Sequence, residues 1–133
     1  MNAITEKLKS AIKDIMVTSL ITVDMQDSMH KVASTLHEHH LSSVPVVDSE
    51  KQECFGIISL KDINQLNARK INLQTIRAWE ACSYKPKCVT PDASIEDVAR
   101  LMVEHRIHHV IIAENSKLKG FVSTLDIIAA CLA

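Results

Sequence analysis

Aromatic residues are scarce in this chain, which has one Trp, one Tyr and two Phe among 133 residues. Proteins that bind RNA or single-stranded DNA use aromatic side chains as stacking platforms, so the scarcity argues against such partners. The chain also lacks an excess of positive charge, because 15 Lys and Arg stand against 16 Asp and Glu. Such a balance provides no basic field to attract a polyanion. We therefore expect no nucleic-acid partner.

Long apolar segments are missing as well. The longest apolar run, 127–133, is far below the roughly 18 residues needed to cross a bilayer. The N-terminus lacks the basic and apolar regions of a signal peptide. We expect a cytoplasmic protein without a membrane segment. The cysteines have no C-x-x-C spacing, which predicts reduced, buried thiols without a chemical role. They are Cys54, Cys82, Cys88 and Cys131.

The sequence does contain an internal duplication, which a shift of 66 residues reveals and which continues at a shift of 64. The shift changes in a polar turn, 48–53 in the first copy and 114–116 in the second, where a difference in length costs little. The matched pairs include Ser28 with Ser94, Val44 with Val110, Gly56 with Gly120, and Asp62 with Asp126. A chain of this length and apolar content fits one globular module built from two similar units.

Both copies predict the same order of elements. Apolar residues recur at helical spacing in 28–38 and 94–104, each led by a serine suited to be the N-cap. Runs rich in β-branched residues predict buried strands at 44–47, 55–58, 110–113 and 118–122. A second helix follows at 60–68 and 124–133. The expected fold is α/β, with two βαββα units that pack about a pseudo-twofold axis. We divide it into an N-terminal helix and lead-in (1–16), a first unit (17–70), a linker (71–82) and a second unit (83–133).

The two glycines of the chain occupy equivalent places, at the start of 56–62 and 120–126. A glycine entering a strand indicates a positive φ, a bulge, or a close approach by another backbone or a ligand. Ser59 and Ser123 stand where strand becomes helix, beside N–H groups that can bind an anion. Asp62 and Asp126 offer carboxylates to paired ribose hydroxyls. Together these residues could hold the phosphate and sugar of a nucleotide.

Helix capping is an alternative explanation for the same residues. Ser-x-x-Asp is close to a capping box, in which the serine caps the helix and the acid favours its positive end. Ser94 and Asp97 have the same spacing at another helix start, with no glycine-led strand before them. The residue pattern by itself favours capping, and it leaves ligand binding open.

Histidines cluster at 37–40 and 105–109, which raises the question of a metal site. The clusters lack acidic partners at the spacing of a zinc site. His39 and His105 are repeat equivalents at helix ends, where a histidine can interact with the terminal carbonyls. We therefore predict no metal site.

His108 and His109 follow a helix and begin a strand. They could donate hydrogen bonds to a phosphate, more strongly when protonated. The first copy has Ser42 and Ser43 at these positions, which are neutral and shorter. Any two sites would therefore be unequal, with the more cationic one in the second copy. No nucleophile elbow, P-loop or G-x-G-x-x-G pattern indicates catalysis, so we expect no enzyme and no required cofactor.

The residues that carry a family resemblance are 12–16, 21–23, 40–48 and 56–62 in the first copy, and 89–94, 106–110 and 120–126 in the second. With these two sets in register, each unit resembles the cystathionine-β-synthase (CBS) domain, and the tandem pair resembles a Bateman module. The sequence departs from the family at Ile111, where a proline is expected, and at Ser42 and Ser43, where basic residues or histidines often reach phosphate.

The resemblance implies a regulatory module that is not an enzyme. Members of the family bind AMP, ADP, ATP or S-adenosylmethionine in clefts between the two units, and many form flat dimers of pairs. For this chain it implies adenine contacts from Thr22, Val23, Cys88 and Val89, ribose contacts from Asp62 and Asp126, and phosphate contacts from Ser59, Lys61, His108, His109 and Ser123. We expect an adenine nucleotide as the ligand, a homodimer, and an unidentified regulated protein. The alternative is a ligand-free module for dimerisation or protein interaction.

Overall fold

The computed structural model describes residues 2–84 and 86–133, which form two compact units. The first-copy unit is Ile21–Pro86. The second-copy unit combines Lys87–Ala133 with the N-terminal segment up to Leu20. The N-terminal segment thus belongs with the second repeat, and the segment between the repeats belongs with the first. We call these two segments, residues 2–20 and 71–84, the lead-in segments.

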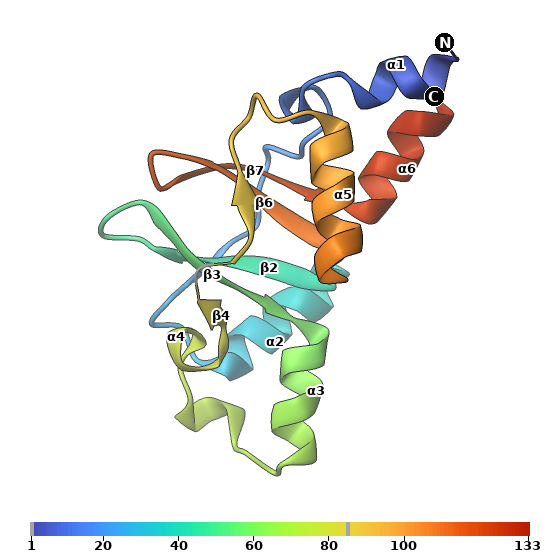
Figure 1. The fold of residues 1–133 in the computed structure, drawn as a ribbon. Coiled ribbons are helices and arrows are strands. Elements are labelled where there is room, and N and C mark those ends of the chain that lie inside the picture. The colour runs from blue at the N-terminus through green and yellow to red at the C-terminus, as the bar shows by residue number, and fades with distance from the viewer. Residues whose placement is uncertain (1, 85) are drawn as a thin grey trace. The chain divides into compact units, whose positions relative to one another are not determined.

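The first-copy unit is a small mixed sheet covered by helices (Figure 1). Strand β1 runs parallel to β2, and β3 is antiparallel to both β2 and β4. The bounds are β1 Val23–Asp24, α2 Met29–Glu38, β2 Ser43–Asp48, β3 Glu53–Ser59, α3 Leu60–Ala68, η2 Leu73–Thr75, α4 Ala78–Ala81 and β4 Ser83–Tyr84.

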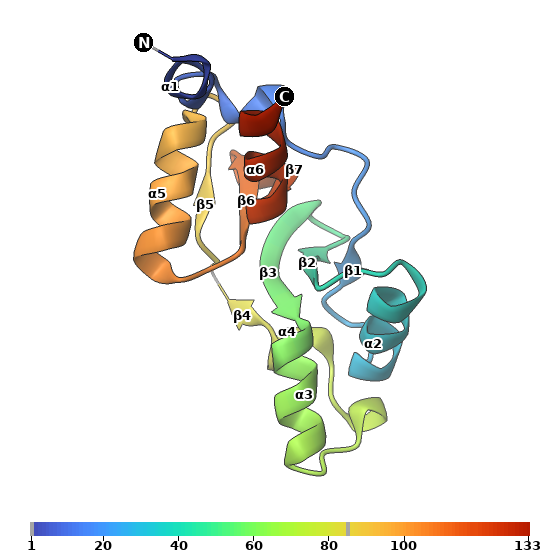
Figure 2. The same cartoon turned by 90° about the vertical axis from the view of Figure 1, so that its right-hand side faces the viewer.

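The second-copy unit repeats this arrangement. Strand β5 is parallel to β6, β6 is antiparallel to β7, and Val17 of the lead-in pairs with Phe121 of β7. Helices α5 and α6 lie side by side in both views (Figures 1 and 2). The bounds are α1 Ala3–Leu8, η1 Ile12–Asp14, β5 Cys88–Val89, α5 Ile95–His105, β6 His109–Glu114, β7 Lys117–Ser123 and α6 Thr124–Leu132. The predicted α/β fold with two similar units is confirmed.

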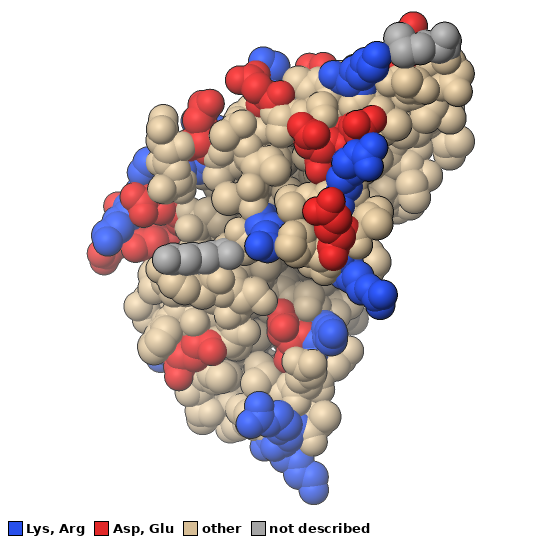
Figure 3. Space-filling view, in the orientation of Figure 1, with Lys and Arg blue, Asp and Glu red and all other residues tan. Residues whose placement is uncertain are grey.

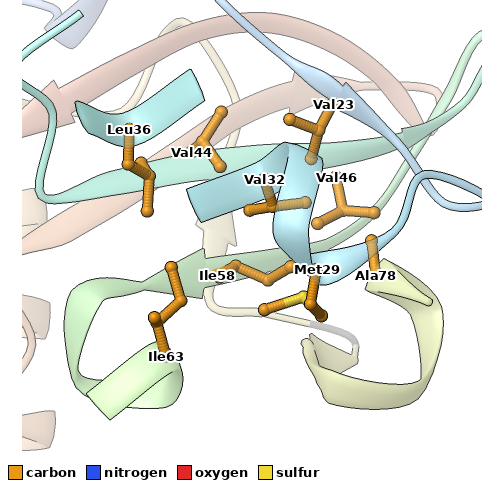
Figure 4. Close-up of a cluster of buried hydrophobic side chains, with 9 residues drawn as sticks. All are labelled: Val23, Met29, Val32, Leu36, Val44, Val46, Ile58, Ile63 and Ala78. Carbon is orange, nitrogen blue, oxygen red and sulfur yellow. The ribbon is translucent and has the colours of Figure 1, made fainter. Parts of the chain in front are cut away.

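Each unit has its own apolar core. Figure 4 shows the core of the first-copy unit, where side chains from α2, β2 and β3 meet. Ala78, from the lead-in that follows α3, is fully buried there, and Ile12 of the N-terminal lead-in is fully buried in the other core. These two residues are repeat equivalents, so both cores are completed by a lead-in segment.

Backbone hydrogen bonds attach each lead-in in the same way. In the second-copy unit, the Ile12 amide donates to the Ala93 carbonyl at 2.7 Å, and the Ile95 amide to the Ser10 carbonyl at 2.9 Å. In the first-copy unit the equivalent bonds run from Ala78 to Asp27 and from Met29 to Ile76, at 2.8 and 2.9 Å.

Some details differ from the sequence expectation. The N-terminal helix is two short helices, α1 and η1, because the backbone between them pairs with the start of α5. All four cysteines are reduced, but none is fully buried: Cys88 is exposed and the other three are half-buried, so the predicted burial is wrong. Cys88 lies in the two-residue strand β5, which pairs with β6. Among residues 2–84 and 86–133, no helix has both the length and the apolarity to cross a bilayer.

Neither glycine has a positive φ. Of the three explanations that the sequence left open, the structure supports both a bulge and a close approach, because the register of β2 against β3 shifts next to Gly56 and that of β6 against β7 shifts next to Gly120. A Cβ on Gly56 would lie 2.6 Å from the Ser83 carbonyl oxygen and 2.7 Å from Cys82 Sγ, and one on Gly120 would lie 2.5 Å from Met16 Sδ. In both units a lead-in segment therefore passes directly over the glycine.

The two glycines should differ in their tolerance of a methyl group. We expect Gly56→Ala to lower the free energy of unfolding by about 2 to 3 kcal/mol, as overpacking does where the obstructing atoms cannot move away. Gly120→Ala should cost about 1 kcal/mol, because the thioether of Met16 can rotate. Urea denaturation of both variants measures the difference, and equal losses would contradict the explanation.

Candidate functional site

Ser123 and Asp126 form a capping box at the start of α6. The Ser123 amide donates to Asp126 Oδ2 at 2.8 Å, and the Asp126 amide donates to Ser123 Oγ at 3.1 Å. These bonds fix both side chains at the point where β7 becomes a helix. The capping interpretation is therefore correct for this pair.

Ser59 and Asp62 form the matching box at the start of α3. The Ser59 amide and hydroxyl donate to Asp62 Oδ2 at 2.8 and 3.1 Å, and the Asp62 amide donates to Ser59 Oγ at 3.3 Å. In both units the box uses Oδ2, so its bonds do not engage the other carboxylate oxygen, Oδ1. Capping and contact with a ligand can thus occur on the same aspartate.

Ser94 and Asp97 are the internal comparison. Ser94 Oγ accepts from the Asp97 amide at 3.0 Å, which is a simple N-cap, and Asp97 is exposed. Unlike α5, both α3 and α6 begin with a complete Ser–Asp box, and both follow a glycine-led strand.

His109 lies directly across the sheet from the α6 cap. In the antiparallel register of β6 and β7, His109 is paired with Ser123, and the His108 carbonyl accepts from the Thr124 amide at 2.9 Å. The second-copy unit therefore brings His108, His109, Ser123 and Asp126 to one end of the β6–β7 hairpin. His108 is exposed and His109 is half-buried.

At the equivalent end of the first-copy unit, Ser42 and Ser43 stand in place of the two histidines. Ser43 is paired with Ser59, and the Ser42 carbonyl accepts from the Leu60 amide at 2.9 Å. Ser43 is buried and Ser42 exposed. Lys61 is the cation nearest in sequence to this end, exposed on the first turn of α3.

The proposed adenine contacts lie farther along the same sheets. Val23 is buried and pairs with Val46, three residues along β2 from Ser43, and Val89 pairs with Ile112, three residues along β6 from His109. Three residues of strand span roughly 10 Å. Thr22 and Cys88, which precede the two valines, are exposed. Each unit thus offers an apolar strand position and a polar helix start on opposite sides of its middle strand, offset by about 10 Å along the strand direction.

Burial changes the titration of His109. Desolvation lowers its pKa below the ordinary value of 6.5, the neighbouring charge of His108 lowers it further, and Asp126 acts in the opposite direction. Burial disfavours the charged imidazolium because it removes water from around it. His109 is therefore mostly neutral at pH 7 in the free protein.

Phe121 is a residue that the sequence analysis did not single out. Its ring stacks on the imidazole of His109, with centroids 5.2 Å apart and an interplanar angle of 12°. Phe121 is opposite Ile111 in the register, so it is the diagonal neighbour of His109 on one face of the hairpin. Side chains alternate between the two faces of a strand, and this alternation along 109–111 and 121–123 could have indicated the pair.

Asp24 was also not singled out. Its carboxylate accepts from the Ser49 hydroxyl and amide and from the Gln26 amide. These bonds, led by the Ser49 hydroxyl, hold the pKa of Asp24 below its usual range. Asp24 ends β1 and connects it to the turn after β2, which gives it a structural role.

The surface charge is mixed. On the face that Figure 3 shows, acidic and basic side chains are interspersed. Within the described part of the chain, no group of three or more His, Cys, Asp or Glu residues is arranged to hold a metal ion. The histidine-rich stretches of the sequence therefore do not come together as a ligand set among these residues.

Comparison with known proteins identifies the family. Residues 12–67 and 78–133 each match the model of the CBS domain, and the chain belongs to that family. The resemblance seen in the sequence is thus confirmed.

Relatives and solved structures agree with this assignment. The chain is 30% identical over 118 residues to protein YlbB of Bacillus subtilis, covering 87% of this chain and 78% of that one. It is similar to CBSX2 in complex with AMP, with a TM-score of 0.84 and 21% identity, over 92% of this chain and 96% of the other. It is also similar to the CBS domain pair of protein MJ0100 in complex with 5′-methylthioadenosine and S-adenosyl-L-methionine, with a TM-score of 0.81 and 25% identity, over 90% and 94%.

Removing the serine hydroxyls tests how much the capping boxes stabilise the protein. Ser59→Ala and Ser123→Ala should each lower the free energy of unfolding by about 1 kcal/mol, the usual cost of losing an N-cap hydroxyl. Thermal denaturation measures the loss, and Ser19→Ala, an exposed serine outside the helices, serves as the control. If the two cap variants are as stable as this control, the serines do not stabilise the helices.

Proposed function

We propose that this chain is a regulatory, non-catalytic module that binds an adenosine-containing nucleotide such as AMP, ADP or ATP. The observation that carries the proposal is the juxtaposition of His109, Ser123 and Asp126 at the start of α6. Imidazole, hydroxyl and helix N–H groups suit a phosphate, and a fixed carboxylate suits a ribose diol.

The ligand contacts follow from this edge of the second-copy unit. Asp126, through Oδ1, accepts the ribose hydroxyls, while His108, His109 and Ser123 contact phosphate oxygens. The adenine lies toward Cys88 and Val89, along the sheet from the phosphate end. The ligand-bound relatives, CBSX2 with AMP and MJ0100 with adenosyl compounds, support this class of ligand.

The first-copy unit offers a weaker version of the same edge. Asp62, Ser59 and Lys61 would contact the sugar and phosphate, and Thr22 and Val23 the adenine. The neutral Ser42 and Ser43 replace the two histidines. The exposed Lys61 side chain is flexible, so its position is less defined than that of the half-buried His109 imidazole, which stacks on Phe121. We therefore assign the stronger site to the second-copy unit.

The test is calorimetric titration with AMP, ADP and ATP. Asp126→Asn should weaken binding of the preferred nucleotide about tenfold or more, since a hydrogen bond to a charged group is worth about 1.5 to 3 kcal/mol. Asn keeps the size of the side chain and an oxygen for the cap. Asp62→Asn should have a smaller effect.

The matched control for these variants is Asp97→Asn, which changes an exposed aspartate at the start of α5. It should bind the nucleotide as the unchanged protein does. The absence of heat with all three nucleotides, or full binding by Asp126→Asn, would overturn the proposal.

A second function, assembly of the module with another copy, is favoured by one surface of α6. Leu125, Ile128 and Leu132 are 72%, 53% and 79% exposed, and their spacing places them on one side of the helix. Soluble proteins seldom leave such an apolar stripe uncovered. We propose that it contributes to a homodimer, through which the module acts on a regulated protein.

Sedimentation over a range of protein concentrations tests the dimer. Ile128→Glu should shift the population to the monomer by at least tenfold in the dissociation constant, because a charge buried in an apolar interface costs several kcal/mol. Val103→Glu alters an exposed apolar residue on α5 and serves as the control. A monomer at all concentrations, or a dimer indifferent to Ile128→Glu, would rule out this surface. A stable dimer whose melting temperature no nucleotide changes would favour assembly without a ligand.

A further inference from the structure

His109 is held in a defined orientation by the residues around it. Its imidazole stacks on Phe121 from β7, with centroids 5.2 Å apart. The backbone of His109 is fixed by its pairing with Ser123. An imidazole stacked on a phenyl ring presents its nitrogen atoms at the ring edge, where they can donate hydrogen bonds.

The charged and titratable groups around His109 come from two elements. His108 precedes it in the chain, and Asp126 acts on it from α6. A carboxylate favours the imidazolium, whereas burial and a second histidine oppose it, and the net effect lowers the pKa of His109. The imidazole is therefore mostly neutral at pH 7. A negative charge added beside it would raise the pKa of His109 again.

The same position in the first copy cannot titrate. Ser43 replaces His109, and Ile57 replaces Phe121 in the register of β2 and β3. The fold is kept without the ring pair, because Ser43 pairs with Ser59 as His109 pairs with Ser123. The stacked pair is thus an addition that the strands themselves do not require.

We propose that His109, positioned by Phe121, couples phosphate binding in the second-copy unit to the uptake of a proton. The inference rests on the proposed nucleotide site and adds its regulation. An anion beside His109 favours the imidazolium, so the bound state takes up a proton that the free state lacks. The affinity for a phosphate ligand consequently rises as the pH falls through the pKa of the bound state. It levels off below the pKa of the free state.

The expected size follows from the effect of one opposite charge. An opposite charge within hydrogen-bonding range raises a pKa by at least about one unit, and one unit corresponds to a tenfold change in affinity. The gain in affinity comes from the contact with phosphate. Adenosine has no phosphate, so its affinity should not change with pH in this way.

AMP titrations at pH 6 and pH 8 provide the test, with His109→Asn beside the unchanged protein. The dissociation constant of the variant divided by that of the unchanged protein should be near 1 at pH 8 and clearly larger at pH 6, and it should approach about 10 at still lower pH, where the free imidazole is also protonated. Using this ratio cancels the titration of the phosphate group itself, whose second pKa is near 6. His37→Asn, an exposed histidine on α2, should leave the binding unchanged.

The outcomes separate the two proposals. AMP binding with a ratio that does not change with pH would overturn proton coupling and leave the nucleotide site standing. No binding of AMP at either pH would remove the site itself. Proton NMR gives an independent reading: the imidazole signal that is missing in His109→Asn should titrate at a higher pH once AMP is added, and an unmoved midpoint would overturn the coupling.

Phe121 acts as a positioning residue, so its variants should alter the pH profile. Phe121→Tyr keeps the ring and should keep the ratio that the unchanged Phe121 gives. Phe121→Ile places the residue of the first copy here and should reduce the ratio to about twofold, because the imidazole is no longer held by a stacked ring. Circular dichroism verifies that both variants fold. An unchanged pH profile in folded Phe121→Ile would overturn the positioning role.

Discussion

The close passage of a lead-in segment over a glycine is the constraint on which each unit depends. Atoms of Ser83 and Cys82 occupy the space that a side chain on Gly56 would need, and Met16 does so at Gly120. This passage allows the lead-in to complete both the sheet and the core. Each glycine lies three residues before the serine that caps a helix. The crossing therefore lies the same short distance along the strand from the cap in both units.

Capping and ligand binding are two uses of the same side chains. The box fixes the serine and the aspartate through Oδ2 and the backbone, while Oδ1 takes no part in it. A carboxylate that is already held loses little conformational freedom when a ligand arrives, which reduces the cost of binding. The preference of the residue pattern for capping was correct, and the cap holds the aspartate in one position, as the proposed ribose contact requires.

Local signals in the sequence predicted helices α2, α3, α5 and α6 and strands β2, β3, β6 and β7, because apolar spacing and the duplication mark them directly. The association of each lead-in with a unit was not predictable in this way. It rests on backbone bonds such as Ile12 to Ala93, between segments far apart in the chain, and backbone groups leave no pattern in the side chains. The stacking of Phe121 on His109 was missed for a related reason, since it depends on strand register.

The two copies agree where folding demands it and differ where a ligand would make contact. Glycine, serine and aspartate recur because the crossing and the cap require them. His109 and Phe121 are replaced by Ser43 and Ile57 without a change in register, so folding did not restrict those positions. A ligand shifts an equilibrium only when it binds two states unequally. Unequal edges on two units of one fold do not by themselves supply two such states. They would make the two units bind the same ligand with different affinities, whereas two identical edges would bind it alike.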